Sequence, residues 1–372
     1  MSAHSRRLVT IVGARPQFVK AAVVSNALRA EGVLEEVLVH TGQHHDAAMS
    51  DRFFDELGMA PPHHHLGISG GTHGVQTGRM LAAVEEVLLA ERPAAVLVYG
   101  DTNSTLAGAL AAAKLHVPVA HVEAGLRSFN QRMPEEVNRV LTDHVADLLF
   151  APTDAAVANL AREGIAAERV HRVGDVMLDA ALQLAAVAEQ RSDVLARLAL
   201  APRGYVLATI HRQENTDDEA RLAALLGALA DVAACWPVVL PLHPRTRARL
   251  AARDVPLRDV PGLHPIDPVG YLDMLMLERH ARAIATDSGG VQKEAYFFRV
   301  PCVTLRDETE WVELVEHGWN VLAPPTDRAA VAAAIGEAAA GSDAAAERPH
   351  PPLYGDGRAA VSIARALAAR YA

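Results

Sequence analysis

Short runs of β-branched and other apolar residues alternate along the chain with longer segments whose apolar positions recur at helical spacing. The first set of short runs predicts five strands, at residues 8–12, 36–40, 95–99, 118–122 and 148–151. The segments that follow them, such as 18–30 and 104–114, predict helices. Strands that alternate with helices predict parallel βαβ units with right-handed crossovers.

The same pattern then starts again. A second set of runs predicts six strands, at residues 169–173, 205–210, 238–241, 263–266, 283–285 and 301–305. Helices are again predicted between them, for example at 219–234. We therefore predict an α/β protein with two doubly wound, Rossmann-like halves that join near residues 165–175. Ligands of such sheets bind beyond the carboxyl ends of the strands, so we expect the site in the cleft between the halves.

Composition narrows the class of protein. A length of 372 residues predicts two or three domains, and 50% hydrophobic with 22% charged residues is typical of a globular protein. The net charge of −10 argues against a nucleic-acid partner, although a few cations and a helix N-terminus suffice to bind phosphate. The 2 cysteines predict no disulfide framework, and no apolar run approaches the ~20 residues of a membrane helix. We expect a cytoplasmic protein without a membrane partner.

Cations and glycine follow the first predicted strand. The sequence Gly-Ala-Arg-Pro occupies residues 13–16, and Lys20 lies four residues later in the predicted helix. A junction of strand, glycine and helix offers backbone N–H groups to an anion, and Arg15 and Lys20 would add positive charge. An ordinary turn with two solvated cations is the alternative. The dinucleotide fingerprint G-x-G-x-x-G is absent after this strand.

Three acids stand where strands of the first half end or helices begin. Asp101 follows one strand and is either a site carboxylate or the N-cap of the next helix, with Asn103 and Ser104 as other caps. Glu123 follows the next strand, where the alternative to a site carboxylate is a surface ion pair with Arg127.

The third acid, Glu135, follows Pro134 in the first turn of a predicted helix. It is four residues from Arg139, and this spacing could form a helix-stabilising ion pair. If Asp101, Glu123 and Glu135 converge at one sheet edge, they repel one another, which suits acid/base chemistry.

Polar residues also follow strands of the second half. His211 and His243 each lie just after a predicted strand and could contact a diphosphate or be ordinary loop residues. The strongest local signal is Ser-Gly-Gly at 288–290, because two glycines at a helix N-terminus let a phosphate approach the backbone closely. Glu294, one turn into that helix, could accept hydrogen bonds from ribose hydroxyls. The histidines at 44–45 and 63–65 lack a ligand pattern, and we predict no metal site.

Taken in order, these motifs resemble those of the non-hydrolysing UDP-N-acetylglucosamine 2-epimerase family. The resemblance rests mainly on the segments 100–102, 121–127, 134–139 and 286–290. It implies the two-domain GT-B fold, with the catalytic carboxylates in residues 1–170 plus 357–372 and a UDP-binding domain at 171–356. It also implies a homodimer without cofactor or metal, acting in polysaccharide biosynthesis such as that of lipopolysaccharide O-antigen.

The resemblance further implies a chemistry, in which UDP is eliminated from carbon 1 to give 2-acetamidoglucal and is re-added after carbon 2 is inverted. The catalytic residues it implies are Asp101, Glu123, Glu135, Arg139 and His211. The substrate and UDP contacts it implies are Arg15, Lys20, His243, Ser288, Gly289, Gly290, Glu294, Arg306 and Trp311. With these assignments the predicted reaction interconverts UDP-GlcNAc and UDP-ManNAc.

One departure from the family pattern concerns the sugar. Trp311 stands where other members carry arginine in the sequence Thr-Glu-Arg-Pro-Glu. Together with the Arg-Pro-Gln-Phe sequence at 15–18, it resembles a branch that includes epimerases of UDP-2,3-diacetamido-2,3-dideoxyglucuronate, which is the alternative substrate. Three other functions stay open: a GT-B glycosyltransferase, a hydrolysing epimerase and a UDP-sugar sensor.

Overall fold

The computed structural model describes residues 6–43, 58–251, 257–345 and 347–372. Contacts within the chain divide it into unit 1, Met1–Leu182 with Pro352–Ala372, and unit 2, Gln183–Pro351. The sequence places the boundaries near residues 170 and 357, whereas the contacts place the first one inside helix α7 (Val176–Arg191). The reason is that the start of α7 packs in unit 1, where Asp179 accepts hydrogen bonds from the first N–H groups of helix α17 (Ala359–Tyr371).

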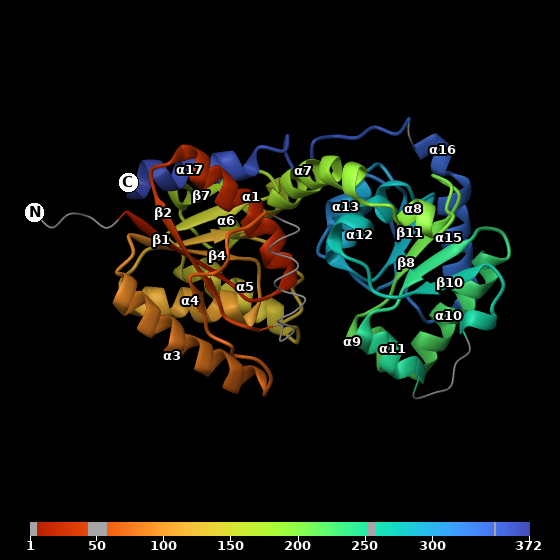
Figure 1. Ribbon diagram of the computed structural model, residues 1–372, viewed down its shortest axis with the longest axis horizontal. Coiled ribbons are helices and arrows are strands. Elements are labelled where there is room, and N and C mark those ends of the chain that lie inside the picture. Colours follow the sequence, from red (N-terminus) through yellow and green to blue (C-terminus); the bar gives the residue numbers. More distant parts are fainter. Residues whose placement is uncertain (1–5, 44–57, 252–256, 346) are drawn as a thin grey trace, which may run out of the picture. The chain divides into compact units, whose positions relative to one another are not determined.

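Unit 1 is built on a seven-stranded parallel sheet with the order β3-β2-β1-β4-β5-β6-β7. Its strands are β1 (Arg7–Val12), β2 (Glu35–His40), β3 (His64–His65), β4 (Ala95–Tyr99), β5 (Val119–Val122), β6 (Leu148–Ala151) and β7 (Val170–Arg172). Its helices, besides α17 and the start of α7, are α1 (Arg15–Glu31), α3 (His73–Glu91), α4 (Asn103–Lys114), α5 (Pro134–Val145), α6 (Asp154–Arg162) and the 3-10 turn η1 (Ala167–Arg169). Helices α1 and α17 pack together on one face of the sheet, and α3, α4 and α5 lie on the other (Figure 1).

Unit 2 repeats the plan with a six-stranded parallel sheet in the order β10-β9-β8-β11-β12-β13. Its strands are β8 (Val206–Thr209), β9 (Val238–Pro241), β10 (Leu263–Ile266), β11 (Ala283–Thr286), β12 (Cys302–Thr304) and β13 (Asn320–Leu322). Its helices are α8 (Val194–Arg197), α9 (Gln213–Thr216), α10 (Glu219–Ala233), α11 (Pro244–Ala251), η2 (Leu257–Asp259), α12 (Tyr271–Arg279), α13 (Gly289–Phe297), α14 (Val312–Glu316), α15 (Arg328–Ala340) and α16 (Ser342–Ala345). Helices α10 and α15 cover one face, and α12 and α13 the other (Figure 1).

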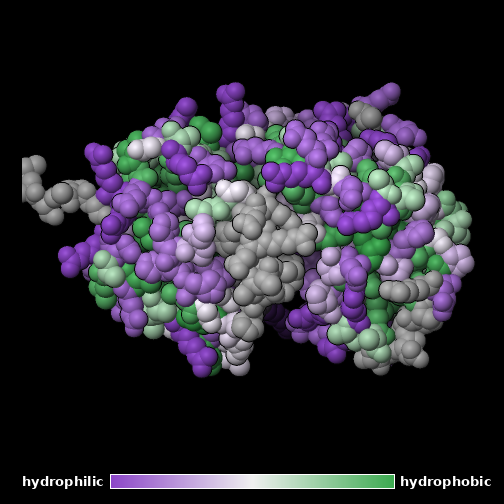
Figure 2. Space-filling view, in the orientation of Figure 1, coloured by the Kyte–Doolittle hydropathy of each residue, from purple (hydrophilic) through white to green (hydrophobic). Residues whose placement is uncertain are grey.

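Burial on both faces explains why the strands appear in the sequence as continuous apolar runs. All five residues of β4 are fully buried, as expected for a parallel strand with helices on both sides. Hydrophilic side chains cover much of the face of the molecule drawn in Figure 2, with hydrophobic ones scattered between them. Among the described residues, no helix has the length and apolarity that crossing a membrane requires.

The predicted strand at 169–173 is real, but its assignment to the second half is wrong. It is β7, which pairs in parallel with β6 through Leu149 and Val170 and so extends the sheet of unit 1. The chain therefore adds β7 at the edge of the unit 1 sheet before it continues into α7. The sequence does not predict the short strands β3 and β13, because two or three residues are too few to set up a periodic pattern.

In each sheet the chain first builds outward in one direction and then returns to build in the other. The strand order therefore reverses between β1 and β4 in unit 1 and between β8 and β11 in unit 2. Such switch points leave a crevice at the carboxyl ends of the strands, where doubly wound proteins bind ligands. The residues that follow these four strands are accordingly the first place to look for a site.

Candidate active site

Asp101 lies at the switch point of unit 1, directly after β4 and Gly100. It does not cap α4, because Thr102 has the extended backbone of an N-cap and its hydroxyl accepts a hydrogen bond from the N–H of Thr105 at 3.3 Å. The Asp101 carboxylate instead accepts a hydrogen bond from Nε of Arg139 at 3.1 Å, and a second guanidinium nitrogen also contacts it. The Asp101 side chain is 30% exposed, so this carboxylate is held in place yet reachable.

Glu123 follows β5 and is the second carboxylate at this edge. Its φ is +72°, a strained left-handed conformation for a residue other than glycine. The carboxylate forms an ion pair with the ammonium group of Lys20 from α1, and both side chains are only 9% exposed. A Cβ on Gly100 would lie 3.1 Å from Oε2 of Glu123, so this acid is packed against the Asp101 turn.

The alternative pairing of Glu123 with Arg127 does not occur. Arg127 binds Asp143 at 2.7 Å and Glu163 at 2.7 Å. Strained backbone such as that of Glu123, maintained by the surrounding structure, is common at functional sites.

The predicted partnership of Arg139 with Glu135 does not form either. Arg139 pairs with Glu136 at 2.8 Å, three residues away, as well as with Asp101. Glu136 also accepts hydrogen bonds from the N–H groups of Ser128 and Phe129 and so ties down the loop before α5. Glu135 is half-buried at the start of α5, without an ion pair inside the described part of the chain. The expected repulsion between acids is therefore offset, because two of the three acids have a cation beside them.

The first βα turn differs from the expected anion site. The side-chain oxygen of Gln17 accepts hydrogen bonds from the N–H groups of Gly13 and Ala14 at 2.8 and 3.0 Å. These two donors are therefore already bonded. Arg15 begins α1, and its side chain lies outside what the structure describes. Of the two predicted cations, Lys20 reaches the edge of the sheet through Glu123.

His211 lies at the switch point of unit 2, just after β8. Its Nδ1 is 3.2 Å from the carboxylate of Asp287, which follows β11 and is fully buried. Burial raises the pKa of Asp287, but the hydrogen bond and charge of His211, with the Arg212 N–H and the Asn215 amide, hold it below its ordinary value. The His211 side chain is 35% exposed, and the ring of His243 lies 5.5 Å from it. Sequence reasoning missed Asp287 as the residue that orients this imidazole.

The α13 N-terminus lies beside the same switch point. Ser288 is its N-cap, and the hydroxyl accepts a long hydrogen bond of 3.5 Å from the N–H of Val291. Gly289 permits a close approach, because a Cβ there would lie 2.4 Å from Oε1 of Glu310. No such crowding exists at Gly290, where an added Cβ would meet only the Ser288 hydroxyl, at 3.9 Å.

Glu310 is itself bound by cations. Arg306 holds one oxygen at 2.8 Å and Arg212 lies 4.0 Å from the other. Burial raises the pKa of Glu310, but these two guanidinium groups outweigh it and hold the pKa below its usual range. Arg306 is only 2% exposed. This predicted UDP contact is therefore engaged with an internal carboxylate.

Two further predicted residues lie in the interior of unit 2. Trp311 is 3% exposed, and the ammonium group of Lys293 lies 4.1 Å from its ring centroid. Glu294 accepts a hydrogen bond of 2.7 Å from the hydroxyl of Tyr271. The pKa of the neighbouring Glu278 is well above its ordinary value because of burial and the Glu294 charge. Nothing in the sequence around Tyr271 and Glu278 signals these partners.

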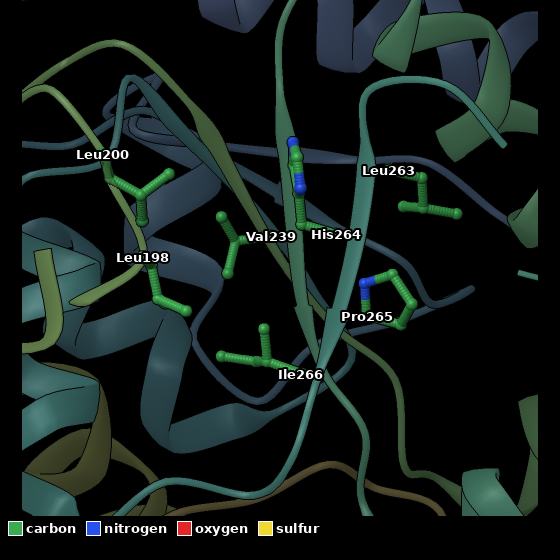
Figure 3. Close-up of a pocket in the computed structure, with 7 residues that line it drawn as sticks. All are labelled: Leu198, Leu200, Val239, Leu263, His264, Pro265 and Ile266. Carbon is green, nitrogen blue, oxygen red and sulfur yellow. The ribbon is translucent and has the colours of Figure 1, made fainter. Parts of the chain in front are cut away.

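A separate hollow in unit 2 has a different character. It lies along β9 and the edge strand β10, and Figure 3 shows its mainly apolar lining, formed by Leu198, Leu200, Val239, Leu263, His264, Pro265 and Ile266. None of the residues predicted to take part in chemistry lines it.

The described histidines at 63–65 make separate contacts with a backbone N–H, with Glu91 and with His40, and no metal-binding group occurs in the described part of the chain. The histidines at 44–45 lie outside the described residues.

Comparisons with known proteins bear on this geometry. Residues 26–368 match the family model described as UDP-N-acetylglucosamine 2-epimerase. The chain is 53% identical, over 97% of its length and 99% of the relative, to the UDP-2,3-diacetamido-2,3-dideoxy-D-glucuronate 2-epimerase of Pseudomonas aeruginosa. It is 51% identical, over 85% of its length and 88% of the relative, to a UDP-N-acetylglucosamine 2-epimerase homolog of Methanococcus maripaludis.

A solved structure is similar over the same span. The Methanocaldococcus jannaschii UDP-GlcNAc 2-epimerase in complex with UDP-GlcNAc and UDP has a TM-score of 0.89 and 42% identity. The match covers 97% of this chain and 99% of that one.

Proposed function

Since the chain belongs to the UDP-N-acetylglucosamine 2-epimerase family, we propose that it inverts carbon 2 of a UDP-linked 2-acetamido sugar by eliminating and re-adding UDP. The observation that carries the proposal is the pair of acid–cation contacts at the switch point of unit 1. Asp101 and Glu123 follow the neighbouring strands β4 and β5, where doubly wound proteins bind ligands. Their cations come from helices, Lys20 from α1 and Arg139 from α5.

The proposed reaction balances in two steps. In the first, a base removes the proton on carbon 2, the electrons of that bond form a double bond to carbon 1, and UDP leaves with the electron pair of the carbon–oxygen bond. In the second, a proton is delivered to the opposite face of carbon 2 and a UDP oxygen attacks carbon 1. Because removal and delivery occur on opposite faces, the chemistry needs two proton-transfer groups.

Unit 1 supplies three carboxylates for these roles. Asp101 and Glu123 are fixed by guanidinium and ammonium groups, and Glu135 lies half-buried at the start of α5. Fixed orientation favours proton transfer, since a catalytic group must be held within hydrogen-bonding reach of the proton it moves. Arg139 and Lys20 reduce the negative charge that these acids present to an anionic substrate. We assign proton transfer to this set.

Unit 2 is proposed to hold the leaving UDP. Negative charge grows on the diphosphate as the bond to carbon 1 breaks, and positioned donors stabilise such charge strongly. His211, oriented by Asp287, and the N-terminus of α13 with Ser288 and Gly289 are the donors in this assignment. The ribose is assigned to Glu294, which Tyr271 orients.

For the sugar we propose UDP-2,3-diacetamido-2,3-dideoxy-D-glucuronate. The high identity to the Pseudomonas enzyme over nearly the whole chain supports it, as does Trp311 in place of the arginine of other members. UDP-GlcNAc is the second candidate, because the similar Methanocaldococcus structure contains UDP-GlcNAc.

The two sugars can be compared directly. Each is incubated with purified protein and no acceptor, and the anomeric proton signals are followed by NMR. We expect conversion of the diacetamido uronate to its carbon-2 epimer with kcat/KM ~10-fold or more above that for UDP-GlcNAc, the discrimination that one extra recognised group supplies. Faster conversion of UDP-GlcNAc supports the second candidate. Stoichiometric UDP release identifies a hydrolysing enzyme, and binding without any conversion of either sugar contradicts the proposal.

We further propose a cytoplasmic homodimer that serves polysaccharide biosynthesis. Exposed apolar side chains on and before α5, namely Phe129, Val137 and Leu141, support a self-association surface. The cysteines Cys235 and Cys302 are both free, which suits a reducing compartment. Light scattering on purified protein tests the dimer, and a monomer at micromolar concentration contradicts it.

A further inference from the structure

His121 is a fully buried histidine on β5, two residues before Glu123. Its two ring nitrogens contact two different elements. Nδ1 is 2.7 Å from a carboxylate oxygen of Asp143 on α5, and Nε2 is 2.7 Å from the backbone carbonyl oxygen of Gly100 after β4. The ring therefore bridges α5 to the turn that carries Asp101.

Each of the two contacts requires a hydrogen on its own ring nitrogen. A carbonyl oxygen only accepts hydrogen bonds, so Nε2 must donate to Gly100. The other oxygen of Asp143 already accepts from Arg127 at 2.7 Å and from the N–H of Gly125 at 3.0 Å. Burial raises the pKa of Asp143, but His121 and Arg127 hold it below its ordinary value, so the carboxyl is ionised and has no proton to donate. Nδ1 must donate as well, and the ring is an imidazolium.

The surrounding charges make a buried imidazolium tolerable. Two cations, His121 and Arg127, face two anions, Asp143 and Glu163, in one connected network. Their formal charges cancel, and each charged group has hydrogen-bond partners, which is the condition under which charges persist in an interior. His144 adjoins the outer end of this network at 3.3 Å from Glu163.

The bridge acts on the two acids at the switch point. Nε2 fixes the Gly100 carbonyl, and Asp101 is the next residue along the chain. Glu123 follows two residues after the ring and packs against Gly100. We infer that His121 is a positioning residue that donates a hydrogen bond from each ring nitrogen and sets the spacing between Asp101 and Glu123, without itself exchanging a proton during turnover. This inference rests on the proposed function for its catalytic consequence, but not for the state of the ring.

The state of the ring is measured on the unmodified protein. In protein labelled with ¹⁵N-histidine, the His121 signals are assigned by their loss in His121→Gln. We expect two ring N–H protons and the nitrogen shifts of an imidazolium, as the two hydrogen-bond acceptors require. A ring with a single N–H proton overturns the inference even if the enzyme is active.

The catalytic consequence is measured with the same variant. A glutamine carries both its N–H donors on one nitrogen and cannot reach both acceptors, so His121→Gln should lower kcat by ~10–100-fold, the usual effect of a small displacement of catalytic groups. UDP affinity by calorimetry and the shape of the pH profile of kcat should be unchanged. His116→Gln, at an exposed histidine before β5, is the matched control and should behave as wild type. A variant that folds and loses one limb of the pH profile shows that His121 exchanges protons, which contradicts the inference. If neither candidate sugar turns over, the proposed function fails while the NMR result still decides the state of the ring.

Discussion

At the scale of single residues, the candidate chemistry rests on two carboxylates that Arg139 and Lys20 hold in place beyond neighbouring strands. Asp101 and Glu123 could be selected because each follows a buried strand. Thr102 and not Asp101 caps α4, and this choice depends on backbone angles that cannot be read from the identity of the side chains. The same holds for Gln17, which bonds the N–H groups of Gly13 and Ala14. Partners distant in the chain, such as Asp287 for His211, need the fold before they can be recognised.

Replacement of Glu123 tests the division of roles among residues. Glu123→Gln keeps the shape of the side chain but removes the charge that a base requires, so turnover should fall ~10²–10⁴-fold. UDP affinity by calorimetry should barely change, because the groups assigned to the leaving diphosphate, His211, Ser288 and Gly289, lie in unit 2. Glu168→Gln, at an exposed glutamate of η1, is the control. Loss of UDP binding with full turnover at saturating substrate would show that Glu123 holds substrate and does not move protons.

At the scale of elements, two neighbouring glycines at the start of α13 are expected to behave differently. A methyl group at residue 289 would meet Glu310 at 2.4 Å and push it from Arg306, while one at 290 has room. Gly289→Ala should destabilise the fold by about 1–3 kcal/mol, because it disturbs the buried pair of Arg306 and Glu310. It should also weaken UDP binding. Gly290→Ala should be neutral or stabilising by up to ~1 kcal/mol through helix propensity. Chemical denaturation and calorimetry compare the two, and equal effects would contradict the proximity of Glu310.

The docking of α17 should depend on pH through Asp179. Burial raises the pKa of this carboxyl from 3.8 to about 6, although the N–H groups of Ala359 and Ala360 favour its charged form. Between about pH 4 and 6 the unfolded chain releases a proton that the folded chain keeps, so stability is highest below this window and is lost as pH rises through it. Asp179→Asn should flatten the curve, because an amide does not titrate in this range. Urea unfolding at several pH values, with Asp343→Asn as exposed control, checks this, and an unchanged slope would refute it.

At the scale of the whole molecule, two halves built from parallel βαβ units could be predicted, but not the order of their strands. Apolar runs separated by helical segments indicated the parallel sheets because buried strands have a distinct pattern. The place where one unit ends could not be found this way. Strand β7 resembles any other short strand in sequence, and only its pairing with β6 assigns it to unit 1. The boundary within α7 is equally invisible, because a continuous helix carries no break in its pattern.

The central claim is that UDP is eliminated and then re-added, with residues of both units taking part. It is tested most directly by measuring which hydrogen isotope carbon 2 of the product carries. The purified protein is incubated in deuterium oxide with the diacetamido uronate or UDP-GlcNAc as the only substrate, and both epimers are recovered. If the proton is removed and returned by acids that exchange with solvent, every product molecule formed should carry deuterium at carbon 2. The same exchange also predicts slower label uptake into recovered substrate through the reverse reaction. Epimer that forms with its original carbon-2 hydrogen would contradict the mechanism and the roles assigned here to Asp101, Glu123 and Glu135.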